Sequence, residues 1–371
     1  MSPIEETGPA HAPSVLTVDL GALKANYRIL ARRAGQAECA AVVKADGYGL
    51  GVGPVFRALR DIGCATYFVA TLDEAVAVRA LEQGPAVYYL NGLMPGEAEL
   101  CRARSIRPTL NDPGQIERWA DFCAAQGEAL PAAVHIDTGM SRLGLTPSET
   151  AALAAAPDRL RRFGFALVLS HLACADAPDH PLNARQRDAF AAATEALPAA
   201  ARSLAASSGV FLGPEWHFDM VRAGVALYGV APFPGQPNPM KQVVHLQGKI
   251  LQTRDVDTPQ TVGYGAAHRF TGPTRVATVA AGYADGYPRS AGEGGVVYVG
   301  KIAAPVIGRV SMDLITIDIS NAPEAKPGDM VDLIGPHNDL DRVAASAGTI
   351  GYELLTRMGR RYRRRYIETA R

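Results

Sequence analysis

The stretch VVKADGYGLG, residues 42–51, contains a lysine that could act as a nucleophile. Lys44 ends the apolar run of residues 40–43 and is followed by glycines. A lysine is almost never fully buried without a partner, and burial makes its ammonium group lose a proton more easily. A deprotonated amine can condense with an aldehyde, but a lysine at a strand end can also extend into solvent. The stretch by itself leaves both interpretations open.

The glycines after Lys44 indicate a tight loop close to a ligand. Gly47, Gly49, Gly51 and Gly53 allow sharp turns and a close approach of the backbone. The spacing G-L-G-V-G differs from the G-x-G-x-x-G of dinucleotide-binding loops, which disfavours that alternative.

Further polar residues end later apolar runs. IDTGMSRLG contains Arg142, VLSHLACAD contains His171, and LAASSG contains Ser207 and Ser208; MVRAGVALYG contains Arg222, Gly224 and Val225. Each has a simple structural explanation alone, as an ion-pair partner, a buried histidine or a helix cap. If the runs are parallel strands of a barrel, however, these ends share the face on which active sites are built. Their convergence therefore favours a catalytic pocket.

From about residue 14 to 230, short apolar runs alternate with helical patterns. The runs lie at 40–46, 66–71, 86–92, 107–112, 132–139, 165–171, 202–209 and around 217–224. Apolar positions near i, i+3, i+4 and i+7 predict helices between them, for example over 21–35 and 72–84. Eight such units predict a (β/α)8 barrel, and their regular spacing disfavours a doubly wound open sheet.

After about residue 240 the pattern changes to alternating β-branched residues separated by Gly, Pro and Asp. This predicts antiparallel strands, with one helix over about 340–359, and the proline-rich segment 231–240 is a plausible junction. We therefore expect an α/β chain with an N-terminal barrel over 14–240 and a C-terminal antiparallel β domain over 241–371. Residues 1–13 are expected to pack with this domain or to be disordered.

Composition and charge limit the possible partners and the compartment. The 371 residues carry 37 Lys+Arg and 37 Asp+Glu, and this balance argues against nucleic acid as the main partner. The five cysteines contain no C-x-x-C pair, which disfavours a disulfide framework or a zinc knuckle. The N-terminus lacks the basic start and apolar run of a signal peptide, and no segment resembles a membrane helix. We expect a cytoplasmic protein without a membrane partner.

Two other features suggest ligands only weakly. HLACADAPDH, residues 171–180, contains zinc-binding residue types, but its loop-like spacing disfavours a metal site. Seven arginines fall within residues 357–371. They could bind phosphate or nucleic acid, although a solvated or interface-bordering last strand explains them better in a chain that is not basic.

The motifs together resemble the alanine racemase family of pyridoxal-phosphate enzymes. They are VVKADGYGLG, HIDTGMSRLG, FDMVRAGVALYG, VGYGAA, AAGYADGYPR, IGRVSMD and GTIGYE, in this order. The resemblance spans about residues 14–367. It implies a homodimer of barrel and β domains with active sites shared between subunits. It also implies an isomerase that interconverts L-alanine and D-alanine and supplies D-alanine for cell-wall peptidoglycan.

The resemblance assigns the two bases of racemisation to Lys44 and Tyr264. Lys44 resembles the lysine that joins the cofactor, and Tyr264 resembles a base delivered from the partner chain. Racemisation needs a base on each face of Cα, and the cofactor ring serves as the electron sink. A tyrosine with an ordinary pKa near 10 is a poor base, and His171 resembles the residue that assists it.

The resemblance also assigns the groups that would bind cofactor and substrate. Arg222 would face the pyridine nitrogen and, as a donor that keeps its proton, would leave that nitrogen unprotonated and limit transamination. The phosphate would be held by Tyr48, Ser207, Tyr352 and the amides of Gly224 and Val225. Arg142 would contact the cofactor's phenolic oxygen and the substrate carboxylate. The partner's Met312 amide would also bind that carboxylate, and Tyr283 would lie close to the substrate. The access corridor would be lined by Asp176, Arg289 and Arg309.

The chain departs from the family pattern at two positions. Many members carry a carbamylated lysine where this chain has His135, and a histidine cannot form that carbamate. We expect Arg142 to be oriented otherwise, for example by chloride, or to be held more loosely. An expected asparagine is Ala206, which removes a polar contact near the ring.

Three alternative functions stay open at this point. A small pocket separates a methyl from a hydroxymethyl group poorly, so a racemase of both serine and alanine is compatible with the sequence. A barrel-type amino-acid decarboxylase is disfavoured by Arg222 and the DTGMSRLG stretch. A non-catalytic carrier of pyridoxal phosphate would resemble the first domain alone, so the β domain disfavours it.

Overall fold

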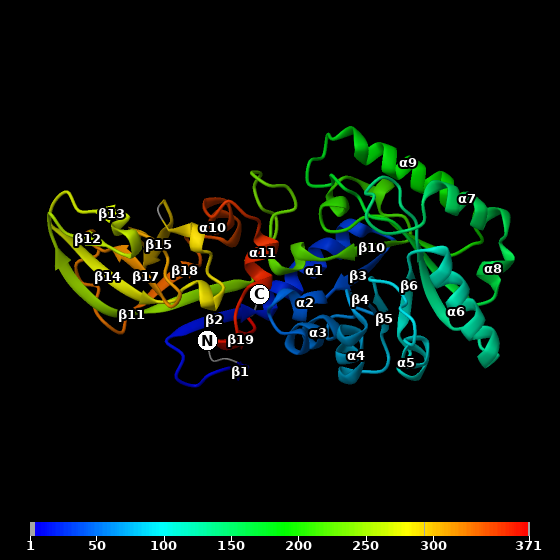
Figure 1. The fold of residues 1–371 in the computed structure, drawn as a ribbon, viewed down its shortest axis with the longest axis horizontal. Helices are drawn as coiled ribbons and strands as arrows, with labels where there is room; N and C mark the ends of the chain where they lie inside the picture. Colours follow the sequence, from blue (N-terminus) through cyan, green and yellow to red (C-terminus); the bar gives the residue numbers. More distant parts are fainter. Residues whose placement is uncertain (1–3, 293, 370–371) are drawn as a thin grey trace.

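The protein consists of two lobes arranged end to end (Figure 1). The computed structural model describes residues 4–292 and 294–369. One lobe contains an eight-stranded sheet surrounded by helices, and the other contains a nine-stranded sheet. The last described strand and the last helix lie where the second lobe meets the start of the barrel (Figure 1).

The first lobe is a nearly closed parallel barrel, as expected from the eight apolar runs. Its strand order is β10-β3-β4-β5-β6-β7-β8-β9, and every pair in it is parallel. A bridge between Ala206 and Arg222 spans the remaining gap between the two end strands. The strands are β3 (Glu38–Val42), β4 (Thr66–Val69), β5 (Ala86–Tyr89), β6 (Arg107–Leu110), β7 (Pro131–His135), β8 (Gly164–Leu169), β9 (Ala201–Ser203) and β10 (Met220–Ala223).

Helices cover the outside of the barrel, and their starts follow local capping rules. Asp19 caps the first long helix by accepting from the Ala22 amide at 3.0 Å, and Thr71 with Glu74 forms a capping box. The helices are α1 (Leu20–Ala34), α2 (Lys44–Tyr48), α3 (Val52–Arg60), α4 (Leu72–Leu81), α5 (Ala98–Ala103), α6 (Pro113–Gln126), α7 (Pro147–Ala155), α8 (Asp158–Arg161) and α9 (Pro181–Glu195), with 3-10 turns η1 (Ser208–Phe211), η2 (Pro214–Trp216) and η3 (Val225–Tyr228).

The second lobe is built on an antiparallel sheet, which confirms the expected C-terminal β domain. The sheet order is β1-β19-β2-β11-β18-β15-β16, and β14 joins β11 to β17. Its strands are β1 (Glu5–Thr7), β2 (Ser14–Asp19), β11 (Val244–Val256), β14 (Thr274–Ala280), β15 (Val296–Val299), β16 (Ile302–Pro305), β17 (Leu314–Asp318), β18 (Met330–Ile334) and β19 (Arg363–Ile367). A small hairpin of β12 (Thr261–Val262) and β13 (His268–Arg269) lies at the far end of this lobe (Figure 1).

The first strand of the chain belongs to the second sheet rather than to the barrel. β2 pairs antiparallel with β11 and parallel with β19, and β1 pairs with β19. Its alternating buried and half-buried positions suit a strand with one face on a core. The expected domain limits of 14–240 and 241–371 stay a prediction, but residues 14–19 pair outside the barrel.

The single helix expected over 340–359 is wrong. The structure contains α10 (Leu340–Ser346) and α11 (Gly351–Thr356), separated by a turn. Gly348 lies in this turn with a φ of +68°, a conformation that ends a helix and favours glycine. The apolar periodicity continued across the turn and hid the break.

Other sequence features have simple counterparts in the structure. All five cysteines are free. Among the described residues, no helix is long and apolar enough to cross a membrane. No group of three or more His, Cys, Asp or Glu side chains within residues 4–292 and 294–369 is arranged to hold a metal ion.

The junction between the lobes is fixed by one buried side chain of α1. Asn26 is fully buried, and its amide donates to the carbonyl oxygens of Leu227 at 3.1 Å and Lys241 at 2.8 Å. Its carbonyl oxygen accepts from the Lys241 amide at 2.7 Å. Asn26 thus ties the end of the barrel to the segment that enters the second sheet.

We predict that Asn26→Ala destabilises the whole chain. The change removes three hydrogen bonds and leaves buried backbone groups unpaired, which costs about 2–4 kcal/mol of the free energy of unfolding. Urea unfolding of the purified protein measures this loss. Arg28→Ala, at an exposed position of the same helix, serves as the control and should change stability by no more than about 0.5 kcal/mol. Equal midpoints for the two variants would contradict the prediction.

Candidate active site

A cavity of about 1260 Å³ opens where the barrel strands end. It is lined by side chains from several strand ends, from the junction 230–238 and from α10 and α11. The sequence-predicted residues that the structure brings together here are Lys44, Tyr48, Arg142, His171, Asp176, Ser207, Arg222, Gly224, Val225 and Tyr352. His135 and Ala206 line the same cavity.

Lys44 reaches the cavity two residues after β3 ends. Burial is the main reason that the pKa of its amine is lowered, and the nearby Arg142 and Arg222 charges act in the same direction, whereas Glu74 opposes them. Within the described residues the Lys44 amine has no ion-pair partner. An amine that is desolvated and lies near positive charges loses its proton more easily than an exposed lysine, which favours a role as a nucleophile or a base.

The chain after Lys44 forms a left-handed turn. The strand expected over 40–46 ends at Val42, and Ala45, Asp46 and Gly47 have φ and ψ values between 45° and 64°. Such values are costly for residues with side chains. The turn is held partly by side chains, because the Ala45 amide donates to Glu74 Oε1 at 2.6 Å and the Val52 amide donates to Asp46 Oδ1 at 2.8 Å.

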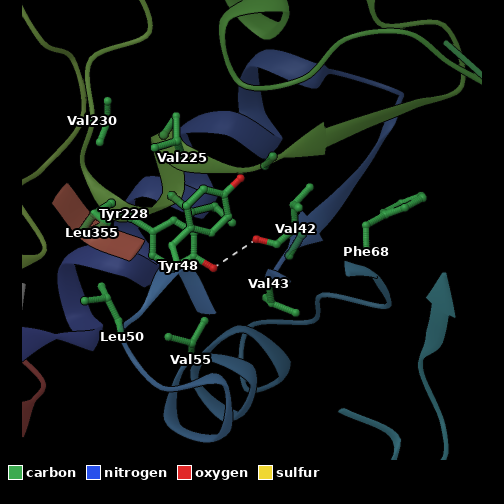
Figure 2. Close-up of a cluster of buried hydrophobic side chains, with 14 of the residues drawn as sticks. Val42, Val43, Tyr48, Leu50, Val55, Phe68, Val225, Tyr228, Val230 and Leu355 are labelled. Atoms are coloured by element: carbon green, nitrogen blue, oxygen red, sulfur yellow. Dashed lines mark hydrogen bonds between the residues drawn. The ribbon is translucent and has the colours of Figure 1, made fainter. Parts of the chain in front are cut away.

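Tyr48 lines the cavity and packs against the buried Tyr228 (Figure 2). The rings of Tyr48 and Tyr228 lie 4.6 Å apart, and the Tyr228 hydroxyl donates to the Val42 carbonyl at 3.1 Å. Burial raises the pKa of Tyr48, which keeps its hydroxyl protonated. A Cβ at Gly224 would lie only 2.8 Å from the Tyr48 hydroxyl, so glycine is needed at this point of closest approach.

Neutral donors converge beside Tyr48. The Ser207 hydroxyl oxygen accepts from the amides of Gly224 at 3.0 Å and Ala226 at 3.2 Å, which leaves its proton free to donate elsewhere. Burial raises the pKa of Tyr352 to about 12, so this hydroxyl is also a donor at neutral pH. Hydroxyl and peptide N–H groups in one concave place form a site for an anion such as a phosphate.

Arg222 is buried in β10 and fixed by neighbouring strands. It donates to the Ser203 carbonyl at 2.8 Å, to the Ser203 hydroxyl at 2.7 Å and to the Ser170 carbonyl at 2.6 Å. Burial lowers its pKa to about 10, so the guanidinium remains protonated at neutral pH. Its side chain therefore presents a donor, and not an acid, to the cavity.

Arg222 also determines the protonation state of His171. One of its NH₂ groups lies 3.2 Å from His171 Nδ1. Because a guanidinium only donates, Nδ1 must accept, and the proton of the neutral ring sits on Nε2. Burial, followed by the charges of Arg222, Arg142 and Lys44, lowers the pKa of His171 to about 3.

His135 is neutral as well. Asn111 donates from Nδ2 to the Leu90 carbonyl at 3.0 Å, so its Oδ1 is the acceptor that lies 2.9 Å from His135 Nδ1. The proton of His135 is therefore on Nδ1. Burial and the Arg222 charge lower its pKa to about 4. Arg142 is exposed and forms no hydrogen bond or ion pair within the described residues.

A second set of predicted residues lies on the other lobe and not at the cavity. Tyr264, in the 3-10 turn η4 (Tyr264–Ala266), is 72% exposed, and Met312 is 53% exposed. Tyr283 is also exposed and begins the 3-10 turn η5 (Tyr283–Asp285), next to Met312, whose carbonyl accepts from the Ala284 amide at 2.9 Å. The exposed Arg309 lies beside the Tyr264 turn, and Arg289 is exposed on the 3-10 turn η6 (Arg289–Ala291). None of these five lines the cavity of its own chain.

The sequence did not reveal the residues that support the site. Glu74 holds the Lys44 turn, Asn111 holds His135, and Ser203 holds Arg222. Of these three residues, only Glu74 belongs to a recognisable sequence motif, because T-L-D-E at 71–74 is a capping box that starts α4. Its second contact, to the Ala45 amide, depends on how two separate βα loops pack.

Similarity to known proteins covers almost the entire chain. Family models described as "Alanine racemase, N-terminal domain" and "Alanine racemase, C-terminal domain" match residues 18–232 and 243–366. Among curated relatives, an alanine racemase of Rhodospirillum rubrum is 51% identical over 96% of both chains. One of Agrobacterium fabrum, named "Alanine racemase, catabolic", is 48% identical over 95% of this chain and 92% of its own. A solved alanine racemase of Bartonella henselae with covalently bound pyridoxal phosphate has a TM-score of 0.92 and 39% identity, covering 95% of this chain and 99% of its own.

We predict that the two neutral histidines make stability depend on acid pH. Their pKa values of about 4 for His135 and about 3 for His171 lie below the ordinary value of 6.5. Between pH 6.5 and 4 the unfolded chain takes up protons that the native chain does not. The free energy of unfolding therefore falls as the pH falls, by up to about 1.4 kcal/mol per pH unit for each histidine.

Urea unfolding between pH 7 and 4.5 tests this dependence. His135→Gln should remove about half of the histidine contribution to the slope. His11→Gln changes an exposed histidine and should leave the slope as in the wild type. A His135→Gln profile parallel to that of the wild type would show that His135 is protonated in the native state.

Proposed function

The chain belongs to the alanine racemase family, whose members are pyridoxal-phosphate-dependent isomerases, and we propose that it interconverts L-alanine and D-alanine with two bases. One base is Lys44, and the other is Tyr264 of a second copy of the chain. The observation that carries the proposal is the desolvated Lys44 amine, which forms no ion pair within the described residues and lies among donors that suit an anionic cofactor.

The residues present fit the cofactor. Ser207, Tyr48, Tyr352 and the amides of Gly224 and Val225 would hold its phosphate, since the hydroxyls are neutral donors. The Gly224 amide, which donates to Ser207 Oγ at 3.0 Å, would exchange that bond for one to the phosphate. When bound, pyridoxal phosphate supplies an aldehyde for an amine and a conjugated ring that accepts electrons from Cα. Arg222 would donate to the ring nitrogen without giving up its proton, which limits competing reactions such as transamination.

Lys44 would move the proton on one face of the substrate Cα. Burial and the positive charges of Arg142 and Arg222 lower the pKa of its amine, which makes the free amine more accessible as a base. Inversion needs a second group on the other face. Without it, a proton removed by Lys44 would return to the same side.

Tyr264 is proposed as the second base, supplied by the partner in a homodimer. In one chain it is highly exposed, as are Met312 and Tyr283 on the same lobe. Large aromatic and apolar side chains left exposed on one lobe are compatible with an interface with another chain. His171, whose proton sits on Nε2, could donate to the Tyr264 oxygen and stabilise its deprotonated form.

Substrate binding is proposed at the mouth of the cavity. Arg142 and the partner's Met312 amide would bind the alanine carboxylate, with Tyr283 of the partner close by. Asp176, Arg289 and Arg309 would line the access corridor. Because Arg142 has no protein partner in the described chain, it is free to turn toward the carboxylate.

Of the three alternative functions, two are set aside and serine racemisation is kept. Both family models are of alanine racemase domains, so the decarboxylase and carrier hypotheses are set aside. Some turnover of serine is expected, because one hydroxyl changes binding in a small pocket by only about 1–3 kcal/mol. We propose that the product D-alanine serves peptidoglycan synthesis, although racemisation is reversible and one relative carries the name "catabolic".

We predict that Lys44→Ala and Tyr264→Phe are each inactive alone and regain activity when mixed. A mixed dimer has one site with Lys44 from one chain and Tyr264 from the other. Random exchange makes half of the dimers mixed, each with one of two sites intact, so activity should return to about a quarter of wild type. The measurement is the rate of D-alanine formation after the two variants are unfolded together, refolded and loaded with pyridoxal phosphate.

Mixing wild-type chains with the Lys44→Ala/Tyr264→Phe double variant serves as the control for subunit exchange. A mixed dimer of these two chains has no intact site, so exchange lowers activity from about a half to about a quarter of wild type. If the mixed variants stay inactive while this control shows exchange, Tyr264 does not act across subunits. If Lys44→Ala retains full racemisation and a borohydride-trapped cofactor, the role of Lys44 is wrong.

A further inference from the structure

The arginine-rich last strand contacts two different parts of the molecule with its two faces. Successive side chains of a strand point in opposite directions. Arg363 and Arg365 both pair with Glu6, with Arg363 Nε at 3.0 Å and Arg365 Nε at 3.1 Å from its carboxylate oxygens. The alternate residues, Arg364 and Tyr366, face the barrel.

Arg364 and Tyr366 bind the carbonyl groups that end the turn after Lys44. Arg364 donates to the Gly49 carbonyl at 2.7 Å, and the Tyr366 hydroxyl donates to the Leu50 carbonyl at 2.8 Å. The other NH₂ group of Arg364 donates to the Met358 carbonyl at 3.2 Å. Arg364 thus links the turn to the segment that follows α11.

Arg364 differs from its neighbours in having no acidic partner. Among the described residues, no carboxylate lies within ion-pair distance of Arg364, whereas Arg361, Arg363 and Arg365 each have one. A guanidinium that donates only to carbonyl groups is suited to cap the end of a turn, where carbonyl groups lack backbone partners.

The turn needs support from outside itself. Ala45, Asp46 and Tyr48 have positive φ values of 53°, 56° and 54°, and a left-handed residue with a side chain is strained by roughly 1–2 kcal/mol. Strained backbone persists only where the surroundings hold it. Lys44 lies directly before these residues, so any relaxation of the turn would move its amine.

The second lobe packs closely enough on the turn to provide this support. A Cβ at Gly49 would lie 2.2 Å from the Leu355 carbonyl oxygen of α11, and a Cβ at Gly51 would lie 2.5 Å from the Tyr366 hydroxyl. Leu355 and Leu50 lie near Tyr48 in the buried cluster of Figure 2. Both glycines are thus required by contacts between the lobes.

We propose that Arg364 and Tyr366 are positioning residues that hold the left-handed turn and thereby keep the Lys44 amine in its place in the cavity. The inference rests on the proposed role of Lys44. It assigns a function to the last strand that its charge alone did not suggest: the second lobe fixes the geometry of a catalytic group in the barrel of its own chain.

Hydrogen exchange of the full-length protein tests the proposal without reference to activity. The amides of Gly49 and Gly51 donate to Ala45 and Asp46 carbonyls within the turn, at 2.6 and 2.8 Å, and report on its opening. Arg364→Met should speed their exchange about tenfold or more, which corresponds to about 1.4 kcal/mol. Tyr366→Phe should act in the same direction, and Arg364→Lys should restore part of the protection.

Arg363→Met is the matched control, because it removes an arginine from the same strand on the opposite face. It should leave exchange in the turn unchanged. Kinetics supply a second measurement: displacement of Lys44 should lower kcat about tenfold or more in Arg364→Met, with KM for alanine changed less than about threefold.

The outcomes separate this inference from the proposed function. Equal exchange of the turn in Arg364→Met and Arg363→Met would overturn the positioning role. If Arg364→Met does not fold, Tyr366→Phe, which removes a single oxygen atom, decides by the same comparison. If borohydride reduction adds no cofactor mass at Lys44 in the wild type, the proposed function fails, while the exchange rates still decide whether the strand holds the turn.

Discussion

The site depends on a lysine amine that is kept out of water and forms no ion pair within the described residues. Lys44 follows a buried strand, and the groups around it are the guanidinium groups of Arg222 and Arg142 and the neutral ring of His171. Burial and the two guanidinium charges lower the pKa of the Lys44 amine, and the Glu74 charge opposes them. The same arrangement has positive character, so it suits an anionic cofactor and the carboxylate of an amino acid. One electrostatic arrangement thus serves both reactivity and binding.

Fixing the protonation states requires a network of donors that reaches beyond the cavity. The hydrogen bonds of Arg222 to Ser170 and Ser203 set its direction, and Arg222 in turn sets the tautomer of His171. Asn111 sets the tautomer of His135 in the same way. Neither histidine needs to titrate near neutral pH. His135 is therefore neutral at neutral pH and adds no charge near Arg142.

The two lobes contribute to the site in two ways. The second lobe of the same chain packs on the Lys44 turn through α11 and β19, and Gly49 is needed where they touch. The exposed surface of that lobe carries Tyr264, Tyr283 and Met312, which do not reach the cavity of their own chain. Under the proposed function, each site takes its framework from one chain and its second base from another.

The sequence by itself determined the eight parallel strands, the change to an antiparallel lobe and the residues at the cavity. Apolar runs and turns are local patterns, and the ends of parallel strands in a barrel must meet on one face. The motifs also led to the family. What local patterns could not show is how distant segments meet. The left-handed turn after Lys44, the pairing of residues 14–19 with the second sheet and the break at Gly348 all depend on packing between segments. The contacts of Arg364 and Tyr366 with the turn join residues more than 300 positions apart, and only the tertiary structure decides such contacts.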